Sequence, residues 1–236
     1  LALMLLAHRF AVRQGSKDRF IVYSVDHGLR PKAAGEAAFV AAEAQKLGFA
    51  ARVLRWHGEK PATGIQQAAR LARYRLIGEA MAADGAEALL TAHHLDDQAE
   101  TVLMRMAHGS GLEGLRGMDR VASVEGLTII RLLLEIDPAA LRAVVDAVGI
   151  VPVSDPGNSD RDYERVRWRQ AMPLLASLGL DAIRLSRLAE RMRDADQALE
   201  GLAAEALAKL ASPLPGNGLG LDRPGYMALP RAVEVR

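Results

Sequence analysis

The sequence of 236 residues contains no cysteine and few aromatic residues. The absence of cysteine excludes disulfide bonds, iron–sulfur clusters, thiolate zinc sites and thiol nucleophiles within these residues. Aromatic residues make up only 4% of the sequence, while apolar residues make up 50%. A sizeable core can therefore form, and it has to be built mainly from alanine, leucine, valine and isoleucine.

Long apolar runs and an excess of one charge are also missing. No segment approaches the roughly 18 apolar residues of a membrane span, and Leu1–Ala7 lacks the basic region of a signal peptide. We therefore expect a soluble, cytoplasmic protein without membrane contact. Because the sequence opens without methionine, we also expect its natural N-terminus to be missing. The 30 basic and 29 acidic residues nearly balance. Most of the basic residues are arginine, whose guanidinium fork suits phosphate groups.

The order of apolar segments indicates alternating helices and strands. Helices are predicted for residues 1–13, 33–47, 64–83, 95–107 and 138–148, several of them ended by glycine. Strands are predicted for residues 19–26, 50–56, 86–92 and 126–133, with a short edge strand at 151–153. This alternation predicts the α/β fold class, a parallel-sheet, Rossmann-like nucleotide-binding domain with helices on both faces.

The remaining segments predict a second, helical part of the chain. Residues 108–118 carry four glycines and residues 154–162 are rich in turn formers, so both are expected to be loops. Helices are expected at 163–178 and 181–210, and a Pro/Gly linker at 212–220. We therefore expect an α/β domain over residues 1–172 and a helical subdomain over residues 173–236.

The strongest local signal is the run TAHHLDDQAET, residues 91–101, directly after a predicted strand. Ligands of parallel α/β sheets bind at the carboxyl ends of the strands. Asp96 and Asp97 fall in the first helical turn, and Glu100 follows on the same face. The cluster could hold a hard cation and a phosphate chain. The alternative is a helix cap with solvated acidic side chains.

Three weaker patterns accompany this run. VDHGLR, residues 25–30, also follows a predicted strand, although any tight turn needs glycine there. Arg70 and Arg73 share one face of a predicted helix, which fits a phosphate contact or simple solvation. Four arginines crowd the stretch before and into the helix from residue 163, interleaved with acids: Arg161, Arg165, Arg167 and Arg169. They fit a phosphate or RNA contact, or a salt-bridged helix start.

Taken in order, these patterns resemble the tRNA(Ile)-lysidine synthetases, a family of N-type ATP pyrophosphatases. The resemblance covers roughly residues 1 to 185 and rests on VDHGLR, GIQQAARLARYRLI, TAHHLDDQAETVLMRMAHGSGLEGL and DPGNSDRDYERVRWR. It implies an ATP-dependent ligase that adenylates C2 of the wobble cytidine in the CAU anticodon of tRNA(Ile). The ε-amine of lysine then displaces AMP, which leaves lysidine. The implied partners are tRNA(Ile), lysine, ATP and Mg²⁺, and a homodimer is compatible with the resemblance.

The resemblance also implies roles for individual residues. The implied catalytic residues are Asp97, Arg73 and Arg165, with Asp97 also the metal ligand. The implied ATP-binding residues are His27, His94 and Arg70. Lysine would bind Glu100 and Asp96, and tRNA would bind Arg167 and Arg169. From the residues alone, metal binding and lysine binding remain alternatives for Asp96, Asp97 and Glu100.

Three departures from the family pattern accompany the resemblance. The Ser-Gly-Gly-x-Asp-Ser pyrophosphate loop expected before Leu1–Ala7 is absent from this sequence. Its backbone N–H groups would hold the pyrophosphate at a helix N-terminus. Val166 replaces a usual asparagine, which puts a polar contact in question, and Leu132 stands where proline is common.

Other functions remain open at this stage. Another tRNA-modifying ATP pyrophosphatase, such as a 2-thiocytidine synthetase, would use cysteines that this sequence lacks. A metal-dependent phosphoesterase could use Asp26 and His27 with the second cluster, His93, His94, Asp96 and Asp97. A nucleotide-binding module of the same fold without catalysis is the third alternative.

Overall fold

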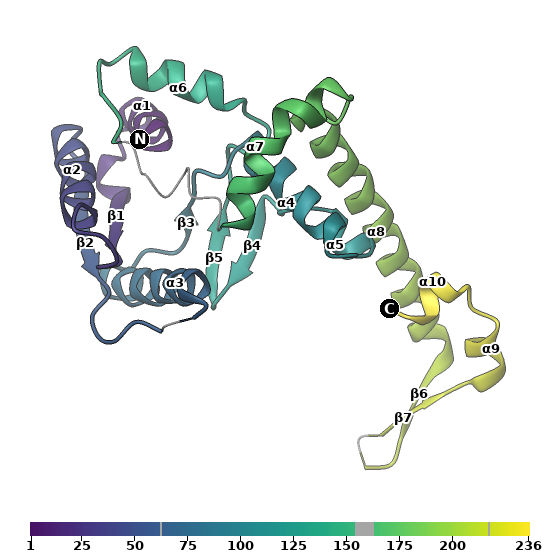
Figure 1. Cartoon of the computed structure of the whole chain (residues 1–236). Helices are drawn as coiled ribbons and strands as arrows, with labels where there is room; N and C mark the ends of the chain where they lie inside the picture. Colours follow the sequence, from purple (N-terminus) through teal and green to yellow (C-terminus); the bar gives the residue numbers. More distant parts are fainter. Residues whose placement is uncertain (62, 154–162, 217) are drawn as a thin grey trace. The chain divides into compact units, whose positions relative to one another are not determined.

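The computed structural model describes residues 1–61, 63–153, 163–216 and 218–236 (Figure 1). Their contacts divide them into two compact units. The first, which we call the sheet unit, comprises the described residues of 1–97 and 119–160. The second, the helical unit, comprises those of 98–118 and 161–236. Helix α4 (Leu95–Ala107) begins in the sheet unit and continues in the helical unit.

This division differs from the predicted boundary after residue 172, because residues 98–118 and 163–172 group with the later helices. Packing explains the difference. Ala99, Val102 and Leu103 of α4 form a buried cluster with Leu185 and Ala189 of a later helix. A helix that is central to the sequence therefore supplies the core of the C-terminal unit. The predicted division into a nucleotide-binding domain and a helical subdomain stays a prediction.

The sheet unit has the predicted alternation of helices and strands. Its elements are α1 (Ala2–Gln14), a short 3₁₀ turn (Lys17–Arg19), β1 (Ile21–Asp26), α2 (Ala33–Lys46), β2 (Ala50–Arg55), α3 (Ile65–Asp84), β3 (Leu89–Leu90), β4 (Val121–Val124), β5 (Leu127–Ile130) and α6 (Pro138–Asp146). Most boundaries fall within two residues of the prediction. Gly15 and Gly85 end α1 and α3 in the left-handed conformation, which glycine adopts without steric cost.

The strand directions confirm the predicted α/β class with parallel pairing. Strand β1 pairs in parallel with β2, from Ile21 opposite Ala50 to Asp26 opposite Arg55. Strand β3 pairs in parallel with β5, and a further bridge joins His94 to Leu133. The described strands form two sheets of this unit rather than one. Parallel pairing brings the carboxyl ends of paired strands to the same edge.

One strand prediction in this unit was wrong, because residues 151–153 form no strand. The predicted strand at 126–133 is confirmed as β5, which also forms an antiparallel hairpin with β4, a strand that was not predicted. The four residues of β4 alternate between exposed and half-buried, so they carry little of the apolar signal that predicts a strand. Predicted strand 86–92 shortens to Leu89–Leu90. The predicted loop at 154–162 lies outside the described residues.

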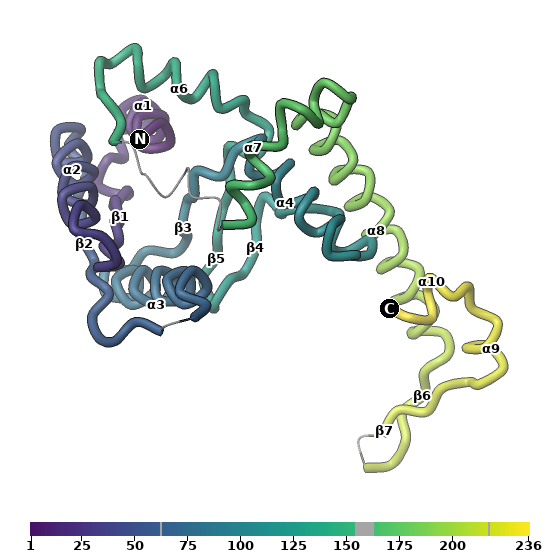
Figure 2. Tube along the Cα trace, viewed as in Figure 1, coloured from purple at the N-terminus to yellow at the C-terminus, as the bar shows by residue number. Residues whose placement is uncertain are grey.

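Helices α1 and α2 share a small core with the start of the first sheet. Met4 and Ala11 of α1 pack with Ala44 of α2 and with Phe49, which precedes β2. Phe49 is 3% exposed, and its ring also contacts Phe20. Burial of large apolar side chains is the main favourable term in such packing. The tube in Figure 2 shows α2 running beside β1 and β2 in this unit.

A polar cluster joins the other side of the same strands to α3. Tyr23 of β1 donates its hydroxyl to Asp84 at the end of α3, over 2.9 Å. Arg52 of β2 forms an ion pair with the same carboxylate. Burial, together with the hydrogen bond to Asp84, raises the pKa of Tyr23 to about 12. The cluster therefore links three elements of the sheet unit through one carboxylate.

The helical unit contains the remaining elements. After the main part of α4 come α5 (Leu112–Leu115), α7 (Glu164–Ser177), α8 (Ala182–Leu210), β6 (Ala211–Leu214), β7 (Gly218–Leu221), α9 (Arg223–Met227) and α10 (Arg231–Glu234). The predicted helices at 163–178 and 181–210 are confirmed. The predicted linker at 212–220 was wrong, because its described residues pair as an antiparallel hairpin, β6 with β7.

The glycine-rich segment 108–118 is not the plain loop that we expected. It contains the short helix α5, and side chains from α4 bind the backbone of its second half. Arg105 donates to the carbonyl oxygens of Gly114 and Gly117, at 2.8 and 2.7 Å. Gln98 exchanges two hydrogen bonds with the backbone of Met118. A Cβ on Gly117 would lie 2.8 Å from the Gln98 amide, and its φ is +69°, so only glycine fits there.

None of the helices that the structure describes is both long and apolar enough to cross a membrane.

Candidate functional site

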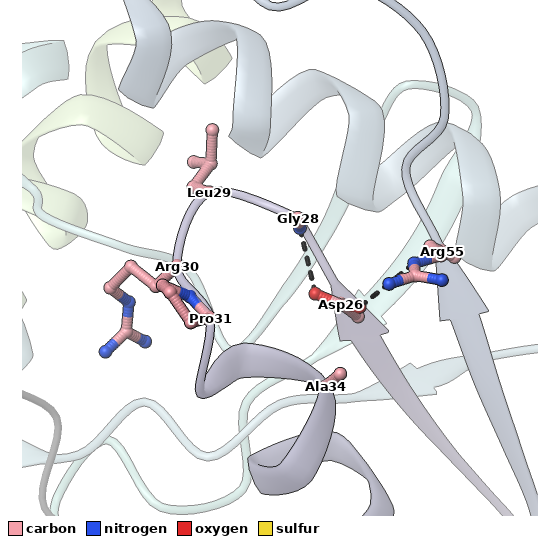
Figure 3. A pocket seen from close by; sticks show the side chains of 7 residues that line it. All are labelled: Asp26, Gly28, Leu29, Arg30, Pro31, Ala34 and Arg55. Atoms are coloured by element: carbon pink, nitrogen blue, oxygen red, sulfur yellow. Dashed lines mark hydrogen bonds and ion pairs between the residues drawn. The ribbon is translucent and has the colours of Figure 1, made fainter.

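The carboxyl ends of β1 and β2 form a pocket of about 350 Å³ (Figure 3). Its lining residues are Asp26, Gly28, Leu29, Arg30, Pro31, Ala34 and Arg55. Asp26 is 3% exposed and accepts the N–H of Gly28 at 2.8 Å. It also forms an ion pair with Arg55 of the neighbouring strand at 3.2 Å. The buried carboxylate thus fixes the turn after β1 and holds one arginine at the strand edge.

The VDHGLR pattern has a structural reason at this turn. Gly28 has a φ of +63°, a conformation that disfavours side chains other than that of glycine. The Asp26 side chain hydrogen-bonds two residues ahead, which is a common way for aspartate to stabilise a turn. The turn places His27 directly beside the strand end, where parallel sheets bind their ligands.

His27 contacts an arginine from a distant part of the sequence. Arg73 of α3 donates Nε to Nε2 of His27 at 3.3 Å, and its Nη2 lies 3.1 Å from the same nitrogen. Burial, and next the charge of Arg73, lower the pKa of His27. The imidazole is therefore neutral at pH 7, with Nε2 as acceptor and the proton on Nδ1. Nδ1 is buried and has no partner among the described residues, so it can donate to a ligand.

A tryptophan and a lysine complete this cluster. The ring of Trp56, directly after β2, meets His27 edge-on with 6.3 Å between centroids. Lys60 lies 3.9 Å above the Trp56 ring and donates to the Trp56 carbonyl at 2.7 Å. Lys60 and Arg73 have no ion pair with a carboxylate among the described residues. Cations without counter-charges beside a neutral histidine favour an anionic ligand such as a phosphate chain.

Arg70 lies on α3 one turn before Arg73, as predicted. Its guanidinium is exposed and lies 5.1 Å from the ring of Tyr74, which is buried. The structure therefore brings Arg73 into contact with His27, whereas the contact described for Arg70 is with Tyr74.

The predicted acidic cluster follows β3 in the same unit. Asp97 accepts the backbone N–H of His94 through Oδ2 at 3.0 Å, and Nε2 of His94 lies 3.4 Å from the same oxygen. Helix α4 begins at Leu95, and a side chain in its first turn that accepts the N–H of the residue before the helix acts as a helix cap. The capping alternative is thus realised for Asp97. His94 nevertheless keeps Nδ1 buried without a partner among the described residues, as His27 does.

The described residues contain no group of three acidic or histidine side chains that could hold a metal ion. A magnesium ion needs only one or two protein carboxylates when it arrives with nucleotide phosphates. Asp97 fits that limited role, because its carboxylate is 14% exposed at the start of a helix.

The other predicted residues meet in the helical unit. Glu100 of α4 is fully buried and forms ion pairs with Arg165 and Arg169 of α7. Arg169 binds both carboxylate oxygens, at 2.7 and 3.2 Å. Arg165 lies 3.3 Å from Oε2 and donates to the hydroxyl of Thr101 at 3.2 Å. Arg165 and Arg169 lie on one face of α7, and Glu100 is the carboxylate that they share.

Two departures from the family pattern lie at described positions, and the structure explains the one at Val166. Val166 is 6% exposed, so this position of α7 faces the interior and suits an apolar side chain. Arg167 lies on the exposed side of the same helix. In the sheet unit, Leu132 is 46% exposed, next to the buried Arg131, which donates to the Asp119 carbonyl at 2.7 Å. Arg161 lies outside the described residues.

Sequence reasoning missed part of the cluster around His27. Arg55, Trp56 and Lys60 were not singled out, although Arg55 and Trp56 are the last two residues of a predicted strand. The end of a strand that pairs in parallel with the strand before His27 was the signal that pointed to them. Lys60 carried no such signal, since only the fold brings it over the indole ring.

Comparison with known proteins identifies the family. The PP-loop domain family matches residues 1–175. The expectation that the pyrophosphate loop is absent is therefore not borne out, since the domain is recognised from residue 1 onward. The tRNA(Ile)-lysidine synthase of Methylobacterium nodulans is 51% identical over 218 residues, which cover 92% of this chain and 64% of that protein. That of Rhodopseudomonas palustris is 44% identical over 241 residues, covering 100% of this chain and 68% of that protein.

The chain thus spans about two thirds of the length of these curated relatives. A solved structure, a U34-tRNA thiolase from Methanococcus maripaludis with its iron–sulfur cluster, has a TM-score of 0.63 and 13% identity. The likeness covers 80% of this chain and 68% of the thiolase, and at this identity it shows the shared fold alone. Sequence and fold together place this chain in the PP-loop domain family, among the tRNA(Ile)-lysidine synthases.

Proposed function

We propose that the protein ligates lysine to C2 of the wobble cytidine of tRNA(Ile) with the CAU anticodon, using ATP and releasing AMP and pyrophosphate. The observation that carries the proposal is the 44–51% identity to tRNA(Ile)-lysidine synthases over 92–100% of this chain. The cations and neutral histidine at the strand ends of the sheet unit supply a fitting place for ATP.

The proposed reaction has two steps. In the first, the C2 oxygen of cytidine attacks the α-phosphorus of ATP, and the bond to pyrophosphate breaks. In the second, the ε-amine of lysine attacks C2, a C–N bond forms, and the C2–O bond breaks to release AMP while the amine loses its proton. Adenylation makes the poor C2–O leaving group a good one. The protein has to neutralise the departing pyrophosphate and hold the amine close to C2.

In this proposal the residues of the sheet unit act on ATP. Arg73 stabilises negative charge that develops on the phosphates, because it has no carboxylate partner among the described residues and is held by His27. His27 and His94 each offer a buried nitrogen to the nucleotide. Arg70 adds positive charge one helical turn before Arg73 on α3. Asp97 would hold Mg²⁺ together with the phosphates, and Asp96 would bind the lysine ammonium.

In the helical unit, Arg165 serves the reacting phosphate and Arg167 and Arg169 contact the tRNA backbone. Arginine suits both tasks, because its guanidinium donates in a fixed fork geometry. A role of Glu100 as a direct lysine ligand has less support, since both of its oxygens already accept from arginines. Homodimer formation and a cytoplasmic location stay predictions.

The alternatives have less support. A cysteine-dependent thiolation is not possible with these residues, which include no cysteine. A metal-dependent phosphoesterase would need a preformed metal cluster, and the described residues contain none. A nucleotide-binding module without catalysis would use the same ATP site as the proposed ligase, but it would bind ATP and form no AMP.

One assay distinguishes these functions. The protein is incubated with ATP, tRNA(Ile) and lysine, and AMP and pyrophosphate are measured with each component left out in turn. We expect pyrophosphate release that needs tRNA, and AMP release that also needs lysine. Phosphate release without ATP would support the phosphoesterase. ATP binding without AMP would support the non-catalytic module and contradict our proposal.

A further inference from the structure

Two exposed arginines of α7 depend on one buried carboxylate. Glu100 is 0% exposed, whereas the side chains of Arg165 and Arg169 are 39% and 43% exposed. Each arginine thus exposes part of its side chain to solvent, while its guanidinium also contacts the buried carboxylate of Glu100. A buried carboxylate is stable only when paired, and here both partners come from the same helix, four residues apart.

The geometry restricts Arg165 at two points. Nε lies 3.3 Å from Glu100 Oε2, and Nη2 donates to Thr101 Oγ1 at 3.2 Å. Arg169 occupies the rest of the carboxylate in a bidentate arrangement, which fixes the plane of the carboxylate. Removal of the charge on Glu100 would therefore release Arg165 directly, and would also leave two guanidinium groups without their shared partner.

We propose that Glu100 is a positioning residue for Arg165 and does not itself contact lysine. This inference rests on the proposed function, in which Arg165 acts on the reacting phosphate. An arginine fixed in advance stabilises transition-state charge without losing conformational freedom at the moment of reaction. Lysine is left to side chains that a ligand can reach, of which Asp96 is one.

The helical unit offers a matched control. Asp196 of α8 is 1% exposed and also pairs with two arginines, Arg116 at 2.8 Å and Arg236 at 2.5 Å. It belongs to the same unit, and the proposed function gives it no role. Asp196→Asn therefore reports the general effect of removing a buried charge between arginines. Any loss that Glu100→Gln shows beyond it is specific to Arg165 and Arg169.

The test compares Glu100→Gln, Glu100→Asp and Asp196→Asn with wild type. We expect Glu100→Gln to slow tRNA-dependent pyrophosphate release without lysine by about 10- to 100-fold, since small misplacements of a catalytic group have this effect. In the lysine-dependent release of AMP, the KM for lysine should change less than about twofold, because the substitution removes no contact with lysine. Glu100→Asp should recover part of the rate, and Asp196→Asn should lower the melting temperature with little change in pyrophosphate release.

A second measurement does not depend on activity. Modification of arginine by phenylglyoxal, followed by mass spectrometry, should be faster at Arg165 and Arg169 in Glu100→Gln and unchanged there in Asp196→Asn. If Glu100→Gln does not fold, Arg169→Lys and Glu100→Asp carry the same comparison with the charge retained. Unchanged modification of Arg165, or a raised KM for lysine with normal pyrophosphate release, would overturn the proposal. A wild-type protein that forms no AMP would instead refute the proposed function, while the modification result would still stand.

Discussion

Arg73 directs two nitrogens of its guanidinium at a single ring nitrogen of His27, Nε2, at 3.3 and 3.1 Å. The two residues are 46 positions apart, on α3 and at the end of β1. A permanent cation that donates to an imidazole nitrogen holds the ring neutral and fixes its tautomer. The pair therefore defines both the charge and the direction of the hydrogen bonds that the end of β1 offers to a ligand.

Acid should destabilise the protein through His27. Burial, followed by the charge of Arg73, lowers the pKa of His27 from its ordinary value of 6.5. Below pH 6.5 the unfolded chain binds a proton that the folded chain does not, so the free energy of unfolding falls as the pH drops. We expect His27→Gln to flatten this dependence between pH 7 and the lowered pKa, in urea unfolding measured at several pH values. An unchanged slope would contradict a neutral His27 in the fold.

Arg73→Ala should lower kcat for pyrophosphate release by about 100-fold, the usual loss when one group that stabilises transition-state charge is removed. Arg75 of the same helix provides the control, because it is exposed and pairs with Glu79 over one turn at 2.8 Å. Arg75→Ala should leave the rate within about twofold, since exposed pairs of this kind contribute little. Equal rates for the two variants would remove Arg73 from the site.

Asp97 combines a capping role with a proposed catalytic role, and two substitutions separate them. Asp97→Asn keeps an oxygen that can accept the His94 N–H, so it should lose only about 0.5 kcal/mol of unfolding free energy. Asp97→Ala loses the cap as well, which costs about 1 kcal/mol more. Both should abolish adenylation, measured as tRNA-dependent pyrophosphate release. Normal release by Asp97→Asn would show that Asp97 is a cap and nothing further.

Arg165→Ala and Arg169→Ala should differ in their kinetics. For Arg165 we expect a lower kcat with KM for tRNA little changed, because it acts on charge that develops in the transition state. For Arg169 we expect a raised KM for tRNA with kcat kept, and a weaker dependence of tRNA binding on salt. If both variants have the kinetics of wild type at saturating and subsaturating tRNA, this stretch of α7 is only a solvated helix face.

Alkaline pH should destabilise the sheet unit through Tyr23. Its pKa is raised from 10 to about 12, first by burial and then by the hydrogen bond to Asp84. Between these values the unfolded chain loses a proton that the folded chain keeps, so the free energy of unfolding falls as the pH rises. Tyr23→Phe should remove this loss of stability at high pH. In an absorbance titration it should also remove the tyrosine ionisation that occurs at the highest pH. A titration of wild type that is complete by pH 11 would contradict the buried hydrogen bond.

The sequence by itself determined most helices and showed which polar segments follow the predicted strands. Helix α4 begins and ends where the sequence predicts it, because acidic residues favour its first turn and apolar side chains repeat on one face. Local signals of this kind act within one or two turns and are visible in a short stretch. Part of the pocket was likewise predicted, because VDHGLR follows a predicted strand, whereas Arg55 of the neighbouring strand was not singled out.

Only the tertiary structure decided which of these residues meet. Nothing local to Arg73 identifies His27 as its partner, and nothing local to Glu100 shows that it is buried under Arg165 and Arg169. The hairpins formed by β4 with β5 and by β6 with β7 were missed or misread for the same reason. Pairings between distant segments depend on the packing of the whole unit. Short strands with little apolar periodicity cannot be recognised from their own residues, because the local sequence does not show which segment they pair with.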